Sequence, residues 1–160
     1  MRKYFHDKSA IFSYQNENDT LIMTHESKLA IADYIKKPLI SKKIVAAFGK
    51  KLQSRHYNIF GRHNEKNIAL AYLTGKRLGI SDKIIFSALT DFKAIDGRFQ
   101  FIGTQKGVHF YNDNNSTTPD STIISLQSLQ KKYPDSNIIL IGGGADKNFH
   151  YEKLSRYITR

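Results

Sequence analysis

Residues 108–129 read VHFYNDNNSTTPDSTIISLQSL, a stretch that predicts a strand, a polar loop and a helix. Apolar side chains alternate with others from Val108 onward, as in a strand with two different faces. Residues 112–117 are polar and have no apolar period, so they predict a loop. Thr118 is then expected as the N-cap of a helix and Pro119 as its first residue. Because α/β proteins bind anionic ligands between a strand end and a helix N-terminus, this stretch indicates either such a site or an ordinary capped helix.

The composition narrows the class of protein. With 160 residues, 40% of them hydrophobic and 12% aromatic, the chain can form a real core in one medium domain or two small pieces. No window is long and apolar enough to cross a membrane, and Met1 is followed by no apolar run, so no secretory signal is predicted. The sequence contains no cysteine. Disulfides, thiolate metal sites and a cysteine nucleophile are therefore excluded, and a cytoplasmic location is expected.

A formal net charge of +11 raises the question of nucleic-acid binding. The basic residues form no long run, however, and occur as short pairs along the chain. The pairs are Lys36-Lys37, Lys42-Lys43, Lys50-Lys51 and Lys131-Lys132. We therefore expect a solvated basic surface first, and a phosphorylated or acidic small ligand next.

The remaining patterns predict an α/β fold. Strands are expected at residues 9–14, 20–24, 43–48, 56–60, 98–102 and 138–141, and helices at residues 26–35, 61–78, from 81 or 82 onward, and at the C-terminal end. Pro38 is expected to end the first helix, and Ile85, Ala88, Leu89 and Phe92 to form the inner face of the helix that follows residue 82. The run 138–141 is continuously apolar, as in a strand covered on both faces. The change from helical to strand patterns places a boundary at residues 94–97.

Single residues give only weak functional signals. The stretch 142–147, GGGADK, fits neither a dinucleotide fingerprint nor a P-loop, so it indicates a tight turn or an anion site with Lys147. The six histidines have no metal-binding spacing. His63 is most simply part of a helix cap, and Arg98 is most simply a surface residue at the start of a strand.

Several motifs follow one another in a fixed order along the chain. They are Gly61-Arg62-His63-Asn64-Glu65-Lys66-Asn67, Gly97-Arg98-Phe99, Gly107-Val108 up to Asn112-Asp113, Ser116-Thr117-Thr118-Pro119 and Gly143-Gly144-Ala145-Asp146-Lys147. In order and spacing they resemble the Mur ligases, most of all the glutamate-adding type. The resemblance extends over nearly the whole chain.

The resemblance implies an ATP- and Mg²⁺-dependent amide ligase of peptidoglycan synthesis. Its substrates would be ATP, glutamate and UDP-N-acetylmuramoyl-L-alanine, with neither membrane nor nucleic acid as a partner. The substrate carboxylate is phosphorylated to an acyl phosphate, which the amino group of glutamate then attacks. Residues 1–95 would form the end of the central ATPase domain, and residues 96–160 the start of a Rossmann-like C-terminal domain.

The resemblance also implies roles for four residues at the nucleotide. Asn67 would contact adenine at the start of its helix, with His63 beside it. Arg98 would reach the ATP phosphates, for which a guanidinium fork is well suited. Asp113 would fix the nucleotide through its ribose or base.

The glutamate and metal sites follow from the same resemblance. Thr117 and Lys147 would hold the incoming glutamate. Lys8 would be the family's carbamylated lysine, whose carbamate oxygens suit Mg²⁺. The chain departs from the family at Asn115, where the family has a lysine, so one charge near the reacting groups is missing.

The phosphate-loop pattern Gly-x-x-Gly-Lys-Thr is not found in the sequence. Because acyl-phosphate formation needs the ATP phosphates to be held and neutralised, we expect the chain alone to be inactive and to need the remaining parts of its ligase. Met1 would then be an internal residue of a longer reading frame. Two alternatives stay open: a stand-alone nucleotide-binding module derived from a ligase, and a basic nucleic-acid-binding protein.

Overall fold

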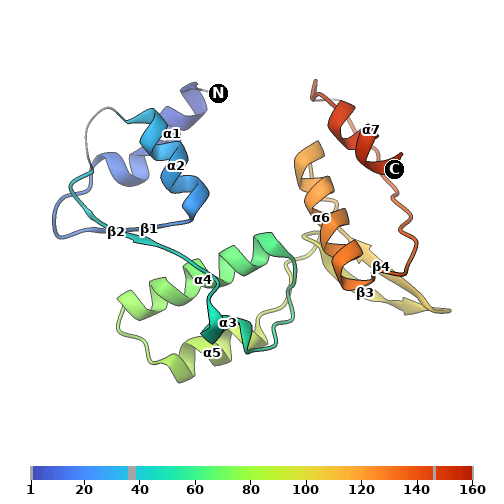
Figure 1. Cartoon of the computed structure of the whole chain (residues 1–160), viewed down its shortest axis with the longest axis horizontal. Helices are drawn as coiled ribbons and strands as arrows, with labels where there is room; N and C mark the ends of the chain where they lie inside the picture. The colour runs from blue at the N-terminus through green and yellow to red at the C-terminus, as the bar shows by residue number, and fades with distance from the viewer. Residues whose placement is uncertain (1, 36–38, 146, 160) are drawn as a thin grey trace. The chain divides into compact units, whose positions relative to one another are not determined.

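The computed structural model describes residues 2–35, 39–145 and 147–159 (Figure 1). Met1, the Lys36-Lys37 pair, Pro38, Asp146 and Arg160 lie outside the described residues. The chain divides into two compact units. Unit 1 comprises Met1–His56 with Lys66–Leu89, and unit 2 comprises Tyr57–Glu65 with Thr90–Arg160. The assignment of residues 1–95 and 96–160 to two Mur ligase domains stays a prediction.

Unit 1 contains a two-stranded parallel sheet. Strands β1 (Thr20–Met23) and β2 (Lys42–Val45) pair from Thr20↔Lys42 to Met23↔Val45. Helix α2 (His25–Tyr34) connects them, as a parallel pair requires, and the Thr24 hydroxyl caps this helix by accepting the Ser27 N–H at 3.1 Å. The predicted elements at residues 20–24, 26–35 and 43–48 are thereby confirmed, with shorter bounds for the second strand.

The strand predicted at residues 9–14 is wrong, because these residues lie in helix α1 (Arg2–Ser13). Phe5, Ser9 and Phe12 follow one another at i, i+4 and i+7, a helical spacing that places them on one face. Phe12 is buried together with Leu21 and Met23 of β1 and with Ile31 of α2. A small serine on the buried face concealed the helical period in the sequence.

Three further helices follow in the chain: α3 (Lys50–Gln53), α4 (Arg62–Arg77) and α5 (Asp82–Asp91). The long predicted helix is confirmed, and it ends before Gly79, which has a φ of +76°. The predicted inner face of α5 is partly wrong. Ile85 is buried, but Phe92 is 46% exposed, and the neighbour Phe86 is buried instead. Phe86 takes this place because its ring stacks on Tyr72 of α4, at a centroid distance of 5.3 Å.

Unit 2 contains an antiparallel hairpin. Strands β3 (Gln100–Gln105) and β4 (Val108–Asn112) pair from Gln105↔Val108 to Gln100↔Asn112, with a bulge between Phe101 and Gly103. The turn residues Lys106 and Gly107 have φ values of +48° and +79°, the combination that a two-residue hairpin turn needs. β3 begins two residues later than predicted, because Phe99 has a φ of +49° and is not extended.

Helices α6 (Pro119–Lys132) and α7 (Glu152–Ile158) complete unit 2. The predicted N-cap of α6 is confirmed, because Thr118 and Ser121 form a reciprocal capping box. Together with the small parallel and antiparallel sheets, the helices confirm the α/β class. Across the described ranges no helix is both long and apolar enough to cross a membrane.

Two further predicted strands are wrong. Residues 138–141 form no strand, and Ile139 and Ile141 are 85% and 93% exposed. A buried strand needs a neighbour to pair with, but in the described part of the chain β3 and β4 pair only with each other. Residues 56–60 also form no strand, and the Phe60 ring packs against Phe99 at a centroid distance of 4.8 Å.

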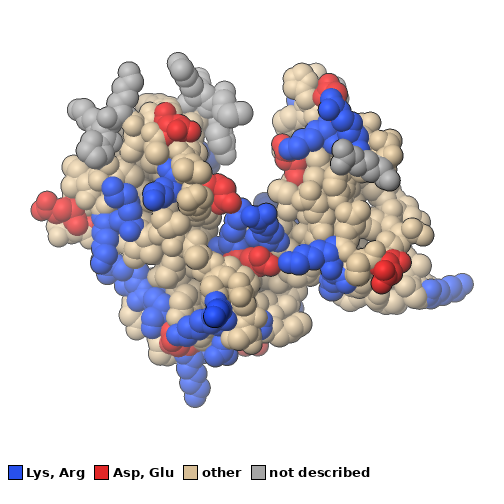
Figure 2. All heavy atoms as spheres, in the orientation of Figure 1, with Lys and Arg blue, Asp and Glu red and all other residues tan. Residues whose placement is uncertain are grey.

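The positive charge is distributed unevenly between the units. Unit 1 has 15 Lys and Arg against 6 Asp and Glu, a net charge of +9, whereas unit 2 has 10 against 8, a net charge of +2. On the face in view, Lys and Arg side chains are visible in many places, with fewer Asp and Glu side chains among them (Figure 2). Whether this surface binds a ligand or is only solvated stays a prediction.

Candidate functional site

Unit 2 brings two of the predicted ATP-binding residues onto neighbouring segments. Arg98 lies on a turn before β3 (residues 96–99, the Arg98 turn), and Asp113 lies on the loop after β4 (residues 113–117, the Asn-Asp loop). Asp113 Oδ1 accepts the Phe99 N–H at 2.9 Å, and the Asn115 N–H donates to the Gly97 carbonyl at 2.9 Å. The Arg98 side chain itself is exposed. A loop and a turn joined in this way present a guanidinium and a carboxylate on adjacent backbone segments.

Gly97 allows this close approach of the two segments. Its φ is +71°, and a Cβ added there would lie 2.0 Å from Asn114 Oδ1 and 2.9 Å from Asn115 Nδ2. A residue other than glycine would therefore meet both backbone strain and a clash. The Gly-Arg-Phe motif thus has a structural reason for its glycine.

An aromatic cluster, formed by Phe60, Phe99 and Tyr111, lies beside the Arg98 turn. Ring centroids are 4.8 Å apart for Phe60 and Phe99 and 5.6 Å apart for Phe99 and Tyr111, whose rings are stacked. Phe99 is buried, with 6% of its surface exposed. The His63 ring meets the Phe99 ring edge-on at 5.9 Å. These ring contacts hold Phe99, the residue that follows Arg98, in position.

His63 is half-buried, and its Nδ1 is a buried polar atom with no hydrogen-bond partner in the described residues. Burial lowers the pKa of His63, and the nearby charge of Asp113 only partly opposes this effect. Buried polar groups are normally paired, so this unpaired ring nitrogen is an unusual feature of the packing around Phe99.

Lys132 and Tyr133, at the end of α6, extend the site in a way that the sequence did not predict. Lys132 Nζ lies 3.9 Å from the centre of the Phe60 ring and donates to the Tyr111 hydroxyl at 3.2 Å. The hydroxyls of Tyr111 and Tyr133 are 2.8 Å apart. Burial and this hydroxyl contact raise the pKa of Tyr111. The only sequence signal was the pair Lys131-Lys132, which gave no indication of an aromatic partner for Lys132 72 positions earlier.

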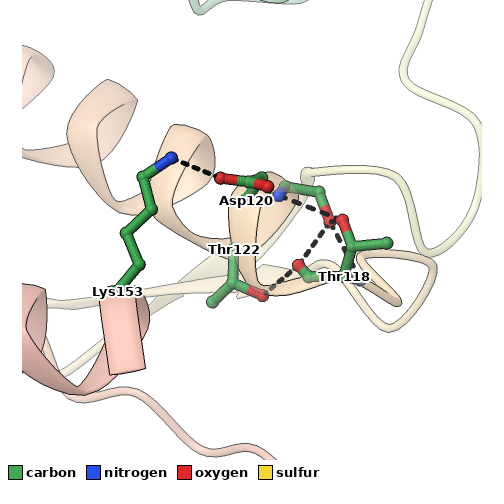
Figure 3. Close-up of polar contacts among 5 residues, drawn as sticks. Thr118, Asp120, Thr122 and Lys153 are labelled. Carbon is green, nitrogen blue, oxygen red and sulfur yellow. Dashed lines mark hydrogen bonds and ion pairs between the residues drawn. The ribbon is translucent and has the colours of Figure 1, made fainter. Parts of the chain in front are cut away.

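The N-terminus of α6 is largely occupied by its own side chains (Figure 3). Thr118 Oγ1 accepts the Ser121 N–H at 3.3 Å, and Asp120 in the first turn pairs with Lys153 at 2.6 Å. Because Asp120 places negative charge at this end, an anionic ligand would compete with it. Thr117, one residue before the cap, is exposed. Of the two interpretations of this stretch, the geometry favours the ordinary capped helix.

The other predicted site residues lie on separate segments. Lys8 is exposed on α1 and Asn67 is exposed on α4, both in unit 1. Lys147 follows the irregular glycine stretch in unit 2 and is also exposed. In the described ranges there is no group of three or more His, Asp or Glu side chains that could hold a metal ion. The roles of all these residues stay predictions.

A shallow hollow lies between α6 and α7, and none of the predicted site residues lines it. Its walls carry both signs of charge, which gives it no preference for one class of ligand. The lining residues are Asp120, His150, Glu152, Lys153, Arg156 and Tyr157.

The chain is similar to a set of curated enzymes, all named UDP-N-acetylmuramoylalanine–D-glutamate ligase. The protein from Clostridium botulinum (strain Langeland) is 30% identical over 170 residues, which cover 96% of this chain and 36% of the relative. The protein from Aquifex aeolicus is 29% identical over 169 residues, covering 98% of this chain and 39% of the relative. The protein from Lachnospira eligens is 35% identical over 95 residues, covering 59% and 20%.

No family model matches the chain. The chain spans between about a third and two fifths of the length of the relatives that it matches along almost all its residues. The two longer matches cover 96% and 98% of the chain and therefore extend over both units. The chain therefore belongs to the Mur ligase family, and the relatives that it matches are named as ligases of UDP-N-acetylmuramoylalanine and D-glutamate.

Proposed function

We propose that the chain is part of an ATP-dependent amide ligase that adds glutamate to UDP-N-acetylmuramoyl-L-alanine in peptidoglycan synthesis. The observation that carries this proposal is the similarity to D-glutamate ligases over 96% of the chain. The joined Arg98 turn and Asn-Asp loop support it, because they place a guanidinium and a carboxylate on neighbouring segments of unit 2.

The reaction proposed has two steps. A carboxylate oxygen of the substrate attacks the γ-phosphorus of ATP, and ADP leaves, which gives an acyl phosphate. The amino group of glutamate then attacks the acyl carbon, the carbon–nitrogen bond forms, and inorganic phosphate leaves as the amine loses a proton. Both steps gather negative charge on phosphoryl oxygens, so cations directed at these oxygens accelerate them.

In this proposal Arg98 holds ATP phosphates. Its side chain is exposed, and its backbone is fixed by the neighbouring Phe99 and Gly97. Asp113 holds the ribose or base. Each oxygen of Asp113 already accepts one hydrogen bond from the protein, but a carboxylate oxygen can accept a second. His63, whose ring meets the Phe99 ring edge-on, is proposed to lie beside the bound nucleotide.

Asn67 is proposed to contact adenine, and Thr117 and Lys147 to hold the incoming glutamate. Lys8, as a carbamate, would supply oxygen ligands to Mg²⁺, an ion that neutralises phosphoryl charge when bound. The described residues provide no further cluster of metal ligands, so the donors present do not by themselves fit a complete magnesium site.

We further propose that the 160-residue chain alone forms no amide. The support is that its sequence contains no Gly-Lys-Ser/Thr phosphate loop, so the residues that hold the transferred phosphoryl group would come from elsewhere. Amide formation from ATP, glutamate and UDP-N-acetylmuramoyl-L-alanine by this chain alone would contradict this part of the proposal.

Calorimetric titration with ATP in the presence of Mg²⁺ tests nucleotide binding. We expect Arg98→Ala and Asp113→Ala each to weaken ATP binding by about tenfold or more, because each removes a charged hydrogen-bonding partner. Lys131→Ala is the matched control, since it removes one exposed positive charge from α6 of the same unit. Equal affinities in Arg98→Ala and Lys131→Ala would mean that only net charge attracts ATP, and would refute the assigned role of Arg98.

A further inference from the structure

We infer that Asn115 and Ser125 are positioning residues that hold the Arg98 turn in place and thereby set where the Arg98 guanidinium can reach. Neither residue belongs to the set assigned above to ATP or glutamate. The inference rests on the proposed function only for its last step, the contact between Arg98 and ATP. The hydrogen bonds that hold the turn are independent of that step.

Asn115 binds the Arg98 turn at two points. Its backbone N–H donates to the Gly97 carbonyl at 2.9 Å, and its side-chain Nδ2 donates to the Asp96 carbonyl at 3.1 Å. Gln100 fixes the same turn from the other side, because its Oε1 accepts the Gly97 N–H at 3.1 Å and its Nε2 donates to Asp96 Oδ1 at 2.8 Å. The two peptide units before Arg98 are therefore tied to residues on both sides.

Ser125 acts on the residue that follows Arg98, and it does so through Asp113. The Ser125 hydroxyl donates to Asp113 Oδ2 at 2.5 Å, while Asp113 Oδ1 accepts the Phe99 N–H at 2.9 Å. Phe99 has a φ of +49°, which an L-residue adopts only when its surroundings hold it there. Because Ser125 lies inside α6, it ties the Asp113 carboxylate, and with it the Phe99 N–H, to a regular helix.

Arg98 is thus enclosed between two fixed neighbours, Gly97 and Phe99, while its own side chain extends into solvent. This also gives a reason for the asparagine at position 115, where the resemblance leads one to expect a lysine. The shorter, neutral amide bonds back to the Asp96 carbonyl within the protein. Asn115 thereby replaces a charge directed at the ligand by a bond that orders the neighbouring arginine.

The test compares Ser125→Ala and Asn115→Ala with Ser128→Ala in the full 160-residue chain. Ser128 is the matched control because it lies on the same helix, but its hydroxyl donates only to the Ile124 carbonyl of that helix, at 2.8 Å. The first measurement is hydrogen exchange of the Phe99 amide by NMR. We expect exchange about tenfold faster in Ser125→Ala, since loss of one bond to a charged partner has about this effect. In Ser128→Ala we expect exchange within about twofold of the wild type, while Ser125→Thr, which keeps the hydroxyl, restores slow exchange.

The second measurement is ATP affinity in a double-mutant cycle. If Ser125 acts through Arg98, Ser125→Ala weakens ATP binding in the wild-type chain but causes no further loss in the Arg98→Ala background. An equal loss in both backgrounds would overturn the positioning role. Unchanged Phe99 exchange in both Ser125→Ala and Asn115→Ala would overturn it without reference to any ligand. If the exchange rates respond while the wild-type chain binds no ATP, the turn is held as inferred and it is the proposed function that fails.

Discussion

Replacement of Gly97 by alanine should destabilise the closed form of the Arg98 turn through backbone strain, a steric clash and a lost hydrogen bond. An L-residue at a φ of +71° costs about 1–2 kcal/mol. The added Cβ would lie 2.0 Å from Asn114 Oδ1 and 2.9 Å from Asn115 Nδ2, so both side chains must move. Loss of the hydrogen bond from Asn115 to Asp96 adds about 1 kcal/mol. The total of about 2–3 kcal/mol corresponds to a change of about 30- to 150-fold in the opening equilibrium.

Hydrogen exchange followed by mass spectrometry measures this opening in peptides that cover residues 96–105. Gly143→Ala is the control, because Gly143 has an ordinary φ and no atom within 4 Å of an added Cβ. Both variants reduce the freedom of the unfolded chain by the same amount, so their difference isolates the strain and the clash in the folded state. Peptides from unit 1 should exchange as in the wild type. The reasoning is refuted if Gly97→Ala and Gly143→Ala agree within about 0.5 kcal/mol, the scatter of a neutral surface substitution.

Three further predictions concern stability, measured by urea unfolding. Burial lowers the pKa of His63, so the folded chain binds fewer protons there than the unfolded chain. The contribution of His63 to the free energy of unfolding should therefore be fully present above pH 6.5 and should decrease as the pH falls below it. His63→Gln should flatten this pH dependence. A curve of unchanged slope in His63→Gln would assign the acid sensitivity elsewhere. Gly75→Ala should add about 1 kcal/mol to stability through helix propensity but remove about 1–3 kcal/mol through overpacking, since the new Cβ would lie 2.8 Å from Ile85 Cδ1. In the Ile85→Ala background the same substitution should stabilise the chain, and a destabilisation there would contradict the packing argument. Thr118→Ala should cost about 1 kcal/mol through loss of the α6 cap, whereas Thr118→Ser should keep it; equal losses in the two variants would show that the hydroxyl contributes nothing.

The sequence predicts elements well where local patterns agree. Thr118 and Pro119 predict the start of α6, and the apolar run after Asn67 predicts the central part of α4. The strand prediction for residues 9–14 was wrong because Ser9 occupies a buried position of the helix and hides its apolar period. The strand prediction for residues 138–141 was wrong because apolar content indicates burial but does not show that a neighbouring strand is present to pair with.

For the candidate site, the sequence predicts the residues carried by motifs but not the contacts that orient them. Arg98 and Asp113 belong to short motifs, and the structure places them on joined segments. Phe60 and Lys132 lie 72 positions apart and carry no local signal, yet they are in direct cation–π contact. Ser125 resembles any polar residue on the exposed side of a helix, and only the fold shows that its hydroxyl reaches Asp113.

The two sheets differ in how far apart their partners lie along the chain, and this difference has a kinetic consequence. In the β3–β4 hairpin the innermost partners, Gln105 and Val108, are separated by a single two-residue turn. Such a hairpin closes in about 1–10 μs. In the β1–β2 pair each residue meets a partner 22 positions away, so α2 must first fold back before any strand contact forms. During synthesis the hairpin can therefore form as soon as β4 has emerged, whereas β1, although made earlier, must wait as an unpaired strand until β2 is complete.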